Sequence, residues 1–337
     1  MGKIWTAVFM LSLATGVSAA AEDLRTSYDK PDLSGVWDFR TLTPLERPEK
    51  FADSAVLTAE QAAEIEDEAV QATAKNDRAS DPNRGAPPPG QSVGGYNRFW
   101  LDSGASVLED LRTSLIVDPP NGRLPPLRDG VKKQSAADEL PTELPVRIRA
   151  GGIGADGPEN RGLAERCLLG FNSGPPIMPG GYNQNIGITQ TPDHVVILNE
   201  MVHDARIIPL GDIPRLGVPR WLGESHGHWE DDTLVVKTVN FHPRLPSFTP
   251  SFFSSVGTAE QLSLTERFQR VDEDTLRYEF TVEDPATFTA PFTAVLLMTK
   301  TDERIYEYAC HEGNYAMRNI LAGARTQERL ALEHTPN

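Results

Sequence analysis

Basic charge, cysteine and long apolar runs are all scarce in this sequence. Lysine and arginine total 32 against 48 acidic residues, and the formal charge of −16 disfavours nucleic acid as a partner. The two cysteines do not have zinc-ribbon spacing. Beyond the N-terminus no apolar run approaches the ~18 residues of a membrane span, so we expect no membrane association after removal of a leader.

Familiar catalytic and cofactor-binding motifs are also missing. The chain contains no H-E-x-x-H zinc motif and no Walker sequence. Residues 90–94 and 223–227 match G-x-S-x-G by letter, and the first of these lies in a polar loop rich in proline and glycine. Ser225 lies in Gly223-Glu224-Ser225-His226-Gly227, but no strand-to-helix turn is expected around it, so we expect no nucleophile elbow there. We therefore expect no cofactor.

The first 21 residues are typical of a secretion signal. Lys3 is the only charge before Glu22, residues 4–13 are nearly all apolar, and Ala19-Ala20-Ala21 offers a cleavage site. We expect a periplasmic or secreted protein in which residues 22–337 form one domain. An uncleaved N-terminal anchor is the alternative.

The two cysteines, Cys167 and Cys310, would then reside in an oxidising compartment. An even count in such a compartment favours one disulfide. That bond would tie the start of the core region to its end. Two buried free thiols are the alternative.

The second half of the chain has the pattern of sequential antiparallel strands. β-branched and aromatic runs alternate with short acidic turns such as Asp272-Glu273-Asp274. Apolar residues at every second position of 276–282 predict one buried face. The expected strands are residues 33–39, 194–200, 204–210, 233–241, 263–271, 275–284, 292–300 and 304–310.

These strands predict a mainly β fold with a few short helices. An antiparallel meander hides its edges by closing into a barrel, and the Gly35-Val36-Trp37 strand resembles the G-x-W strand of lipocalin-like barrels. A two-sheet β-sandwich is the alternative. A capping box formed by Thr58 and Gln61 predicts a helix from Ala59. Further helices are expected over residues 129–139 and 314–333, and residues from about 40 to 165 are otherwise irregular and rich in loops.

Several sequence blocks occur together over roughly residues 115–325. The two longest are E-M-V-H-D-A-R-I-I-P-L at 200–210 and Y-E-Y-A-C-H-E-G-N-Y at 306–315. In these blocks the chain resembles a large group of exported bacterial proteins. That group carries no established activity, so the resemblance implies export and no particular function. His226 and His228 depart from the pattern expected in the group.

Polar side chains gather at two expected strand ends. The first cluster is His203, Asp204 and Arg206, and the second is Glu307, His311 and Glu312. A histidine beside a carboxylate is the minimal unit for acid–base catalysis, because the carboxylate fixes the tautomer and stabilises the imidazolium. We expect His203 and His311 to face one cavity. The alternative is that Asp204 and Arg206 form a buried ion pair and that each histidine caps a turn.

Two further groups could contact a ligand or a metal. His226 and His228 share one face if their segment is a strand, and Glu224 or Glu230 could add a carboxylate, but the pair alone predicts no tightly bound zinc. Aromatic and amide side chains could line a cavity for a substrate. These are Tyr182, Asn183, Trp221, Tyr308 and Tyr315.

Two classes of function follow from these features. The paired clusters favour an exported enzyme, a hydrolase or lyase that acts on a small and possibly aromatic organic molecule. The missing nucleophile and metal motifs favour a non-catalytic barrel that binds a small apolar ligand. In both cases the partner is a small molecule.

Overall fold

The computed structural model describes residues 24–78, 83, 85, 101–135, 156–251 and 254–334, and the expected secretion signal lies outside them. The described chain is mainly β. It contains one ten-stranded sheet and one three-stranded sheet. In spatial order the large sheet runs β6 (Ala205–Pro209), β5 (His194–Asn199), β4 (Asn185–Gln190), β1 (Gly35–Asp38), β13 (Phe292–Thr301), β12 (Thr275–Glu283), β11 (Ser263–Arg270), β8 (Thr233–Val239) and β7 (Glu224–Glu230).

The remaining elements are short or lie at the edge of this sheet. The tenth strand, β2 (Ile116–Asp118), pairs with β13. The small sheet is β3 (Lys133–Ser135), β10 (Ser254–Val256) and β9 (Phe248–Ser251). The helices are α2 (Ala59–Asn76), α3 (Ala316–Glu333) and the short 3-10 turns η1 (Glu49–Phe51), η3 (Pro158–Asn160), η4 (Met201–His203) and η5 (Ala259–Gln261).

The large sheet rolls around a core that its own inner face fills. The predicted alternation along β12 is confirmed: Tyr278 and Phe280 are fully buried, and Arg277 between its apolar neighbours is not. Trp37, in the G-x-W strand, is fully buried on β1 between β4 and β13. Because aromatic and aliphatic side chains pack the interior, the rolled sheet encloses a core and not an open lumen.

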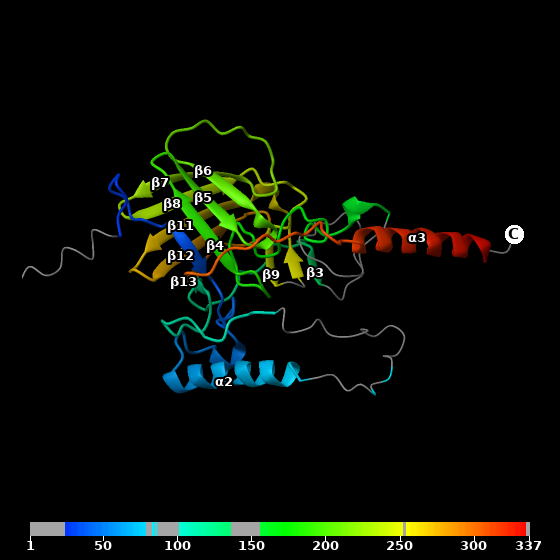
Figure 1. The fold of residues 1–337 in the computed structure, drawn as a ribbon, viewed down its shortest axis with the longest axis horizontal. Helices are drawn as coiled ribbons and strands as arrows, with labels where there is room; N and C mark the ends of the chain where they lie inside the picture. Colours follow the sequence, from blue (N-terminus) through cyan, green and yellow to red (C-terminus); the bar gives the residue numbers. More distant parts are fainter. Residues whose placement is uncertain are drawn as a thin grey trace, which may run out of the picture.

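The two ends of the rolled sheet, β6 and β7, lie next to each other (Figure 1). They meet at one parallel bridge between Leu210 and Gly227, and the Gly211 N–H donates to the Gly227 carbonyl at 3.3 Å. No continuous ladder joins these two fully described strands, so the sheet is not closed and the expected barrel is not confirmed. We call the line along which β6 faces β7 the seam.

Packed side chains, in place of a ladder, fill part of the seam. A Cβ atom at Gly227 would lie 2.8 Å from Leu210 Cδ2 and 3.1 Å from Ile208 Cγ2. Glycine at this position therefore allows apolar side chains of β6 and the residue that follows it to approach the backbone of β7.

Two expected elements are wrong. Residues 304–310 form no strand, because β13 already pairs with β12 on one side and with β1 and β2 on the other. The expected helix over 129–139 is interrupted by β3, whose pairing with β10 overrides local helix preference; residues 136–139 lie outside the described chain.

The helices lie outside the rolled sheet (Figure 1). Helix α2 begins with the predicted capping box between Thr58 and Gln61. It packs in a small separate apolar cluster with Leu57 and Val107. Helix α3 extends away from the sheet and has no buried residue among those described.

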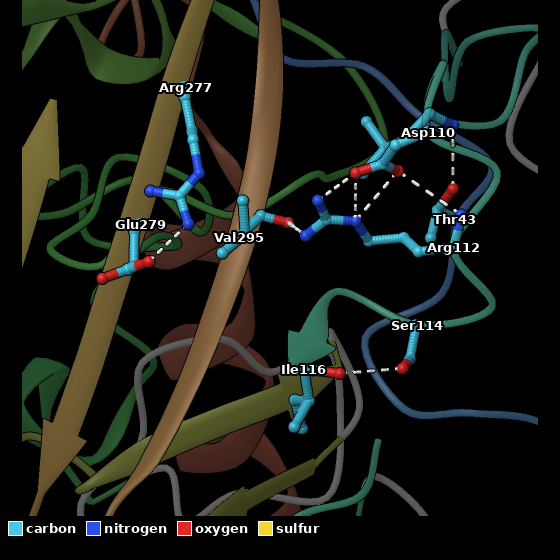
Figure 2. Close-up of polar contacts among 9 residues, drawn as sticks. Thr43, Asp110, Arg112, Ser114, Ile116, Arg277, Glu279 and Val295 are labelled. Atoms are coloured by element: carbon cyan, nitrogen blue, oxygen red, sulfur yellow. Dashed lines mark hydrogen bonds and ion pairs between the residues drawn. The ribbon is translucent and has the colours of Figure 1, made fainter. Parts of the chain in front are cut away.

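A short polar segment attaches the α2 region to the sheet (Figure 2). Asp110 forms an ion pair with Arg112, whose Nη1 donates to the Val295 carbonyl of β13 at 3.4 Å. The Val295 N–H in turn donates to the Leu115 carbonyl at 2.9 Å. The irregular N-terminal region is thus fixed to the sheet by backbone contacts beside β2.

Candidate functional site: a cavity at the seam

The predicted disulfide between Cys167 and Cys310 is confirmed, with Cα atoms 5.7 Å apart. It fixes the chain after β13 to the segment that precedes β4. The Asn314 side chain adds a hydrogen bond to the Glu165 carbonyl at 3.3 Å. The disulfide therefore holds the second polar cluster, residues 307–312, beside the segment around Cys167. The same segment contacts the first cluster, because Asp204 Oδ2 accepts from the Gly170 N–H at 3.3 Å.

The first predicted cluster divides between the surface and the core. His203 is exposed in the turn between β5 and β6, where Val202 and His203 have positive φ of 60° and 42°. Positive φ is strained for a β-branched residue, so this turn has an unusual backbone. Arg206 instead points into the rolled sheet and is 5% exposed. The three residues therefore do not act on one surface.

The second predicted cluster lies in irregular, exposed chain. Glu307, His311 and Glu312 are all exposed. Because residues 304–310 are not a strand, the argument that Glu307 and His311 share a strand face is wrong. Neither His203 nor His311 lines the cavities described below. That the two histidines face one cavity stays a prediction.

The predicted ligand-contacting aromatics separate into three places. Tyr182 and Tyr308 stack with ring centroids 6.5 Å apart, and Phe171 packs edge-on against Tyr182 at 5.1 Å. Asn183 adopts φ of 51° beside them, and its carbonyl accepts from the Asn172 side chain. Tyr315 is 69% exposed before α3. Trp221 lies apart from the others, beside the seam.

Arg206 is part of a buried polar network on the inner face of the seam. Its guanidinium donates twice to the Glu266 carboxylate, at 3.0 and 2.5 Å, and once to Ser225 Oγ at 3.2 Å. The Tyr278 hydroxyl donates to the same carboxylate at 2.8 Å. Burial lowers the pKa of Arg206, but Glu266 more than offsets this and the pKa stays above its ordinary value. The sequence predicts a buried ion pair as the alternative to a catalytic Arg206. The structure has such a pair, but the partner of Arg206 is Glu266 and not Asp204.

A cavity of about 600 Å³ opens on the outer side of the seam. Its walls are the outer face of β6, the start of β7 and the 211–223 loop that connects them. We call it the seam cavity. It is lined by Leu168, Ala205, Arg206, Ile207, Pro209, Ile213, Pro214, Leu216, Arg220, Trp221, Leu222, Gly223, Glu224, Ser225 and His226.

Glu224 holds the loop against the seam. Its carboxylate accepts from the backbone N–H groups of Leu216 at 2.5 Å and Gly217 at 3.2 Å, and from Asn240 Nδ2 at 2.7 Å. Burial raises the pKa of Glu224, but these hydrogen bonds outweigh it and the pKa lies below its usual range. The Arg215 guanidinium adds a bond to the Glu224 carbonyl at 2.7 Å. The Glu224 carboxylate, with three hydrogen bonds, therefore fixes the loop that forms this wall of the cavity.

His226 and His228 lie on the outer face of β7, as their spacing predicts. Nε2 of His226 is 3.8 Å from Glu224 Oε1, and Nε2 of His228 is 3.1 Å from Glu230 Oε1. Each histidine thus faces its own carboxylate. Across the described part of the chain, no group of three histidine, cysteine or acidic side chains is arranged to hold a metal ion.

A second cavity of about 310 Å³ lies on the other side of Trp221, which lines both. Six prolines, among them Pro175 and Pro176, form much of its wall with Phe171 and Phe248. We call it the proline-lined cavity. Its described lining residues carry no titratable side chain. The seam cavity is therefore the stronger candidate for a site that uses charge.

Sequence reasoning missed the apolar walls of the seam cavity. Ile207 is 66% exposed and Leu216 is 69% exposed, although both are large and apolar. The signal was present in β6, where the outer-face positions Ala205, Ile207 and Pro209 carry no polar side chain. An outward face that is apolar in this way indicates a contact surface.

The chain matches no known family model, and neither a curated protein nor a solved structure is significantly similar to it. None of the described helices is long and apolar enough to cross a bilayer.

Proposed function

We propose that this protein binds a small, largely apolar molecule in the seam cavity. The observation that carries the proposal is the exposed apolar wall formed by Ile207, Ile213 and Leu216 beside a ready-made hollow. Its volume of about 600 Å³ lies within the ~300–1,000 Å³ of small-molecule sites. A ligand seated there would remove these side chains from water, which is favourable.

The polar groups at the floor of the cavity support binding over chemistry. Arg206 is already paired with Glu266, and Glu224 already accepts three hydrogen bonds. Ser225 Oγ bonds to Arg206 and Thr238, and no histidine is among its partners. These side chains already use their hydrogen-bonding groups within the protein. They therefore stabilise the walls of the cavity, and none of them is activated as a nucleophile.

Binding of the neutral fluorescent probe N-phenyl-1-naphthylamine tests this proposal. We expect saturable binding to the native protein and affinity weaker by about tenfold in Ala205→Trp, because the indole fills the cavity and displaces apolar contacts. Ala205 is exposed and lines the cavity, so the fold tolerates the change. Ala290→Trp, exposed and outside both cavities, is the matched control.

Equal binding by all three proteins would contradict the seam cavity as the site. Loss of binding in both variants would show a general effect of surface tryptophan and would also count against it. Absence of saturable binding in the native protein would contradict the function itself.

An acid–base enzyme is the second candidate, favoured by His226 facing Glu224 across 3.8 Å in the same cavity. Screening the native protein against aromatic esters, ethers and lactones tests it. We expect His226→Gln to abolish any turnover that arises in the seam cavity. If His203→Ala or His311→Ala abolishes it and His226→Gln does not, the exposed clusters are the site. Absence of turnover on the whole panel counts against the enzyme.

Export completes the proposal. We propose that residues 1–21 are removed as a secretion signal and that the mature protein acts in a periplasm or outside the cell. The disulfide supports this, because such bonds persist in oxidising compartments. The resemblance to exported bacterial proteins points the same way. The sheet resembles a lipocalin-like barrel that is not closed, and in this proposal the ligand binds at the open seam.

A further inference from the structure

One charged side chain that lines the seam cavity has no ion-pair partner among the residues that the structure describes. Arg220 lines the cavity and is exposed, and its guanidinium forms no hydrogen bond or ion pair with any residue that the structure describes. Its backbone is well held, since its N–H donates to the Asn240 carbonyl at 2.9 Å and its carbonyl accepts from the His242 N–H at 2.8 Å. His226 also lines the cavity, and its Nε2 lies 3.8 Å from the Glu224 carboxylate.

Two further cations lie near the seam cavity without lining it: Arg215 on the 211–223 loop and Lys237 on β8. Arg215, on the loop, donates to the carbonyls of Glu224 and Lys237 at 2.7 and 3.1 Å and has no carboxylate partner within the described chain. Lys237 is exposed opposite His226 in the pairing of β7 with β8. Arg220, Arg215 and Lys237 thus form no ion pair within the described chain. The 211–223 loop and the start of β7 also carry the carboxylates of Asp212 and Glu224.

Glu224 keeps its negative charge in the cavity wall, because its hydrogen-bond donors are neutral, and it offsets part of this local positive charge. Glu224 accepts hydrogen bonds from Leu216, Gly217 and Asn240, and Glu266 is paired with Arg206 inside the sheet. The overall acidity of the protein acts at longer range, and salt screens exposed charges beyond ~8 Å at physiological ionic strength. The Arg220 guanidinium has no carboxylate partner within the described chain, so it is the charged group of the cavity that is available to an anion.

Building on the proposed function, we infer that the ligand of the seam cavity is a small organic acid. Its apolar body lies against Ile207 and Leu216, and its carboxylate binds Arg220. A planar guanidinium matches a carboxylate with two parallel hydrogen bonds, which an ammonium group cannot do. His226 is the second donor available to the acid.

Competition by two ligands of equal chain length separates this inference from the proposed function. Decanoate and decanol are each used to displace N-phenyl-1-naphthylamine from the native protein. We expect decanoate to bind tighter than decanol by about tenfold, a charge-assisted pair at a partly exposed site. High salt should reduce this preference, because the groups that cause it are exposed.

Three variants locate the preference. Arg220→Gln should lose most of the preference for decanoate while its affinity for decanol stays unchanged, and Arg220→Lys should keep part of it because the charge remains. Arg304→Gln is the matched control, since Arg304 is exposed and also lacks a described partner, but lies outside both cavities. It should bind both ligands as the native protein does.

Each outcome decides one of the two proposals. Equal displacement by decanoate and decanol overturns the organic acid and leaves the proposed function standing. Displacement by neither contradicts both. A preference that survives in Arg220→Gln, or that falls equally in Arg304→Gln, overturns the assignment to Arg220. A parallel loss of decanol binding in Arg220→Gln shows a structural role for this residue and overturns it as well.

Discussion

The two sides of the seam between β6 and β7 use the same kinds of residue in opposite ways. On the inner side, Arg206 is buried and bonded twice to Glu266, whose carboxylate also accepts from the Tyr278 hydroxyl. On the outer side, Arg220 is exposed and has no partner within the described chain, and Ile207 presents an apolar surface to solvent. The inner side therefore stabilises the fold, and the outer side has the properties of a binding surface.

The contrast has a physical cause. A buried charge must be paired, because removing one partner of a buried ion pair lowers the free energy of unfolding by about 3–5 kcal/mol. An exposed charge carries no such requirement, so its missing partner leaves it available to a ligand. At the open seam, a buried and paired charge, Arg206, lies on β6, and an exposed charge without a described partner, Arg220, lies on the loop that joins β6 to β7.

The largest expected effect comes from breaking the inner pair. Glu266→Leu leaves Arg206 buried without its partner, and we expect a loss of about 4 kcal/mol in the free energy of unfolding, measured in urea. Arg206→Met/Glu266→Leu removes both charges and should recover most of that loss. If the double variant is as unstable as the single one, the pairing is not the cause.

Removing the disulfide should rank second. Cys167→Ser/Cys310→Ser releases a closed loop with a sequence separation of 143 residues, and we expect about 3 kcal/mol less stability. Hydrogen exchange should show the loss of protection first in residues 302–315, which the bond ties to Glu165 and its neighbours. Stability within about 0.5 kcal/mol of the native protein would contradict this anchoring role.

Loosening the outer wall should have a smaller and local effect. Glu224→Gln weakens the charged anchor of the 211–223 loop, and we expect about 1–2 kcal/mol less local stability. Trypsin should then cleave faster after Arg215 and Arg220, which lie in that loop. Glu303→Gln, an exposed residue outside the cavity, is the control. Equal cleavage of both variants and the native protein would show that Glu224 does not hold the loop.

The smallest effect is the pH dependence of the same anchor. The pKa of Glu224 is lower in the folded protein than its usual 4.5, so the folded state favours the carboxylate. Its contribution is complete above that usual value and is lost as the pH falls through the folded pKa. Urea unfolding should show a constant gap between native and Glu224→Gln from pH 7 to 5, narrowing below. A gap that widens in acid would contradict the sign.

Much of the sheet could be predicted from the sequence, because alternation of residue types reports burial directly. Tyr278 and Phe280 are buried as expected, and the capping box of Thr58 and the pairing of Cys167 with Cys310 are present. The segment 304–310 was misjudged because strand-like residues were read without knowing that both sides of β13 are occupied.

The site was harder to predict for a different reason. Residues of β6, the 211–223 loop and β7 form the cavity only because the ladder is interrupted there, and no local pattern reports a missing ladder. Trp221, Arg206 and His226 belong to three different predicted groups, and no local sequence pattern places them at one cavity. The apolar outer face of β6 was the one usable signal.

A crystal structure with bound 11-bromoundecanol tests the central claim most directly, because the bromine locates the ligand without reference to its charge. We expect an anomalous bromine peak between the outer face of β6 and the 211–223 loop, with the alkyl chain of the ligand against Ile207 and Leu216. A peak in the proline-lined cavity, or none in crystals of protein that binds the compound in solution, would contradict the seam cavity as the binding site.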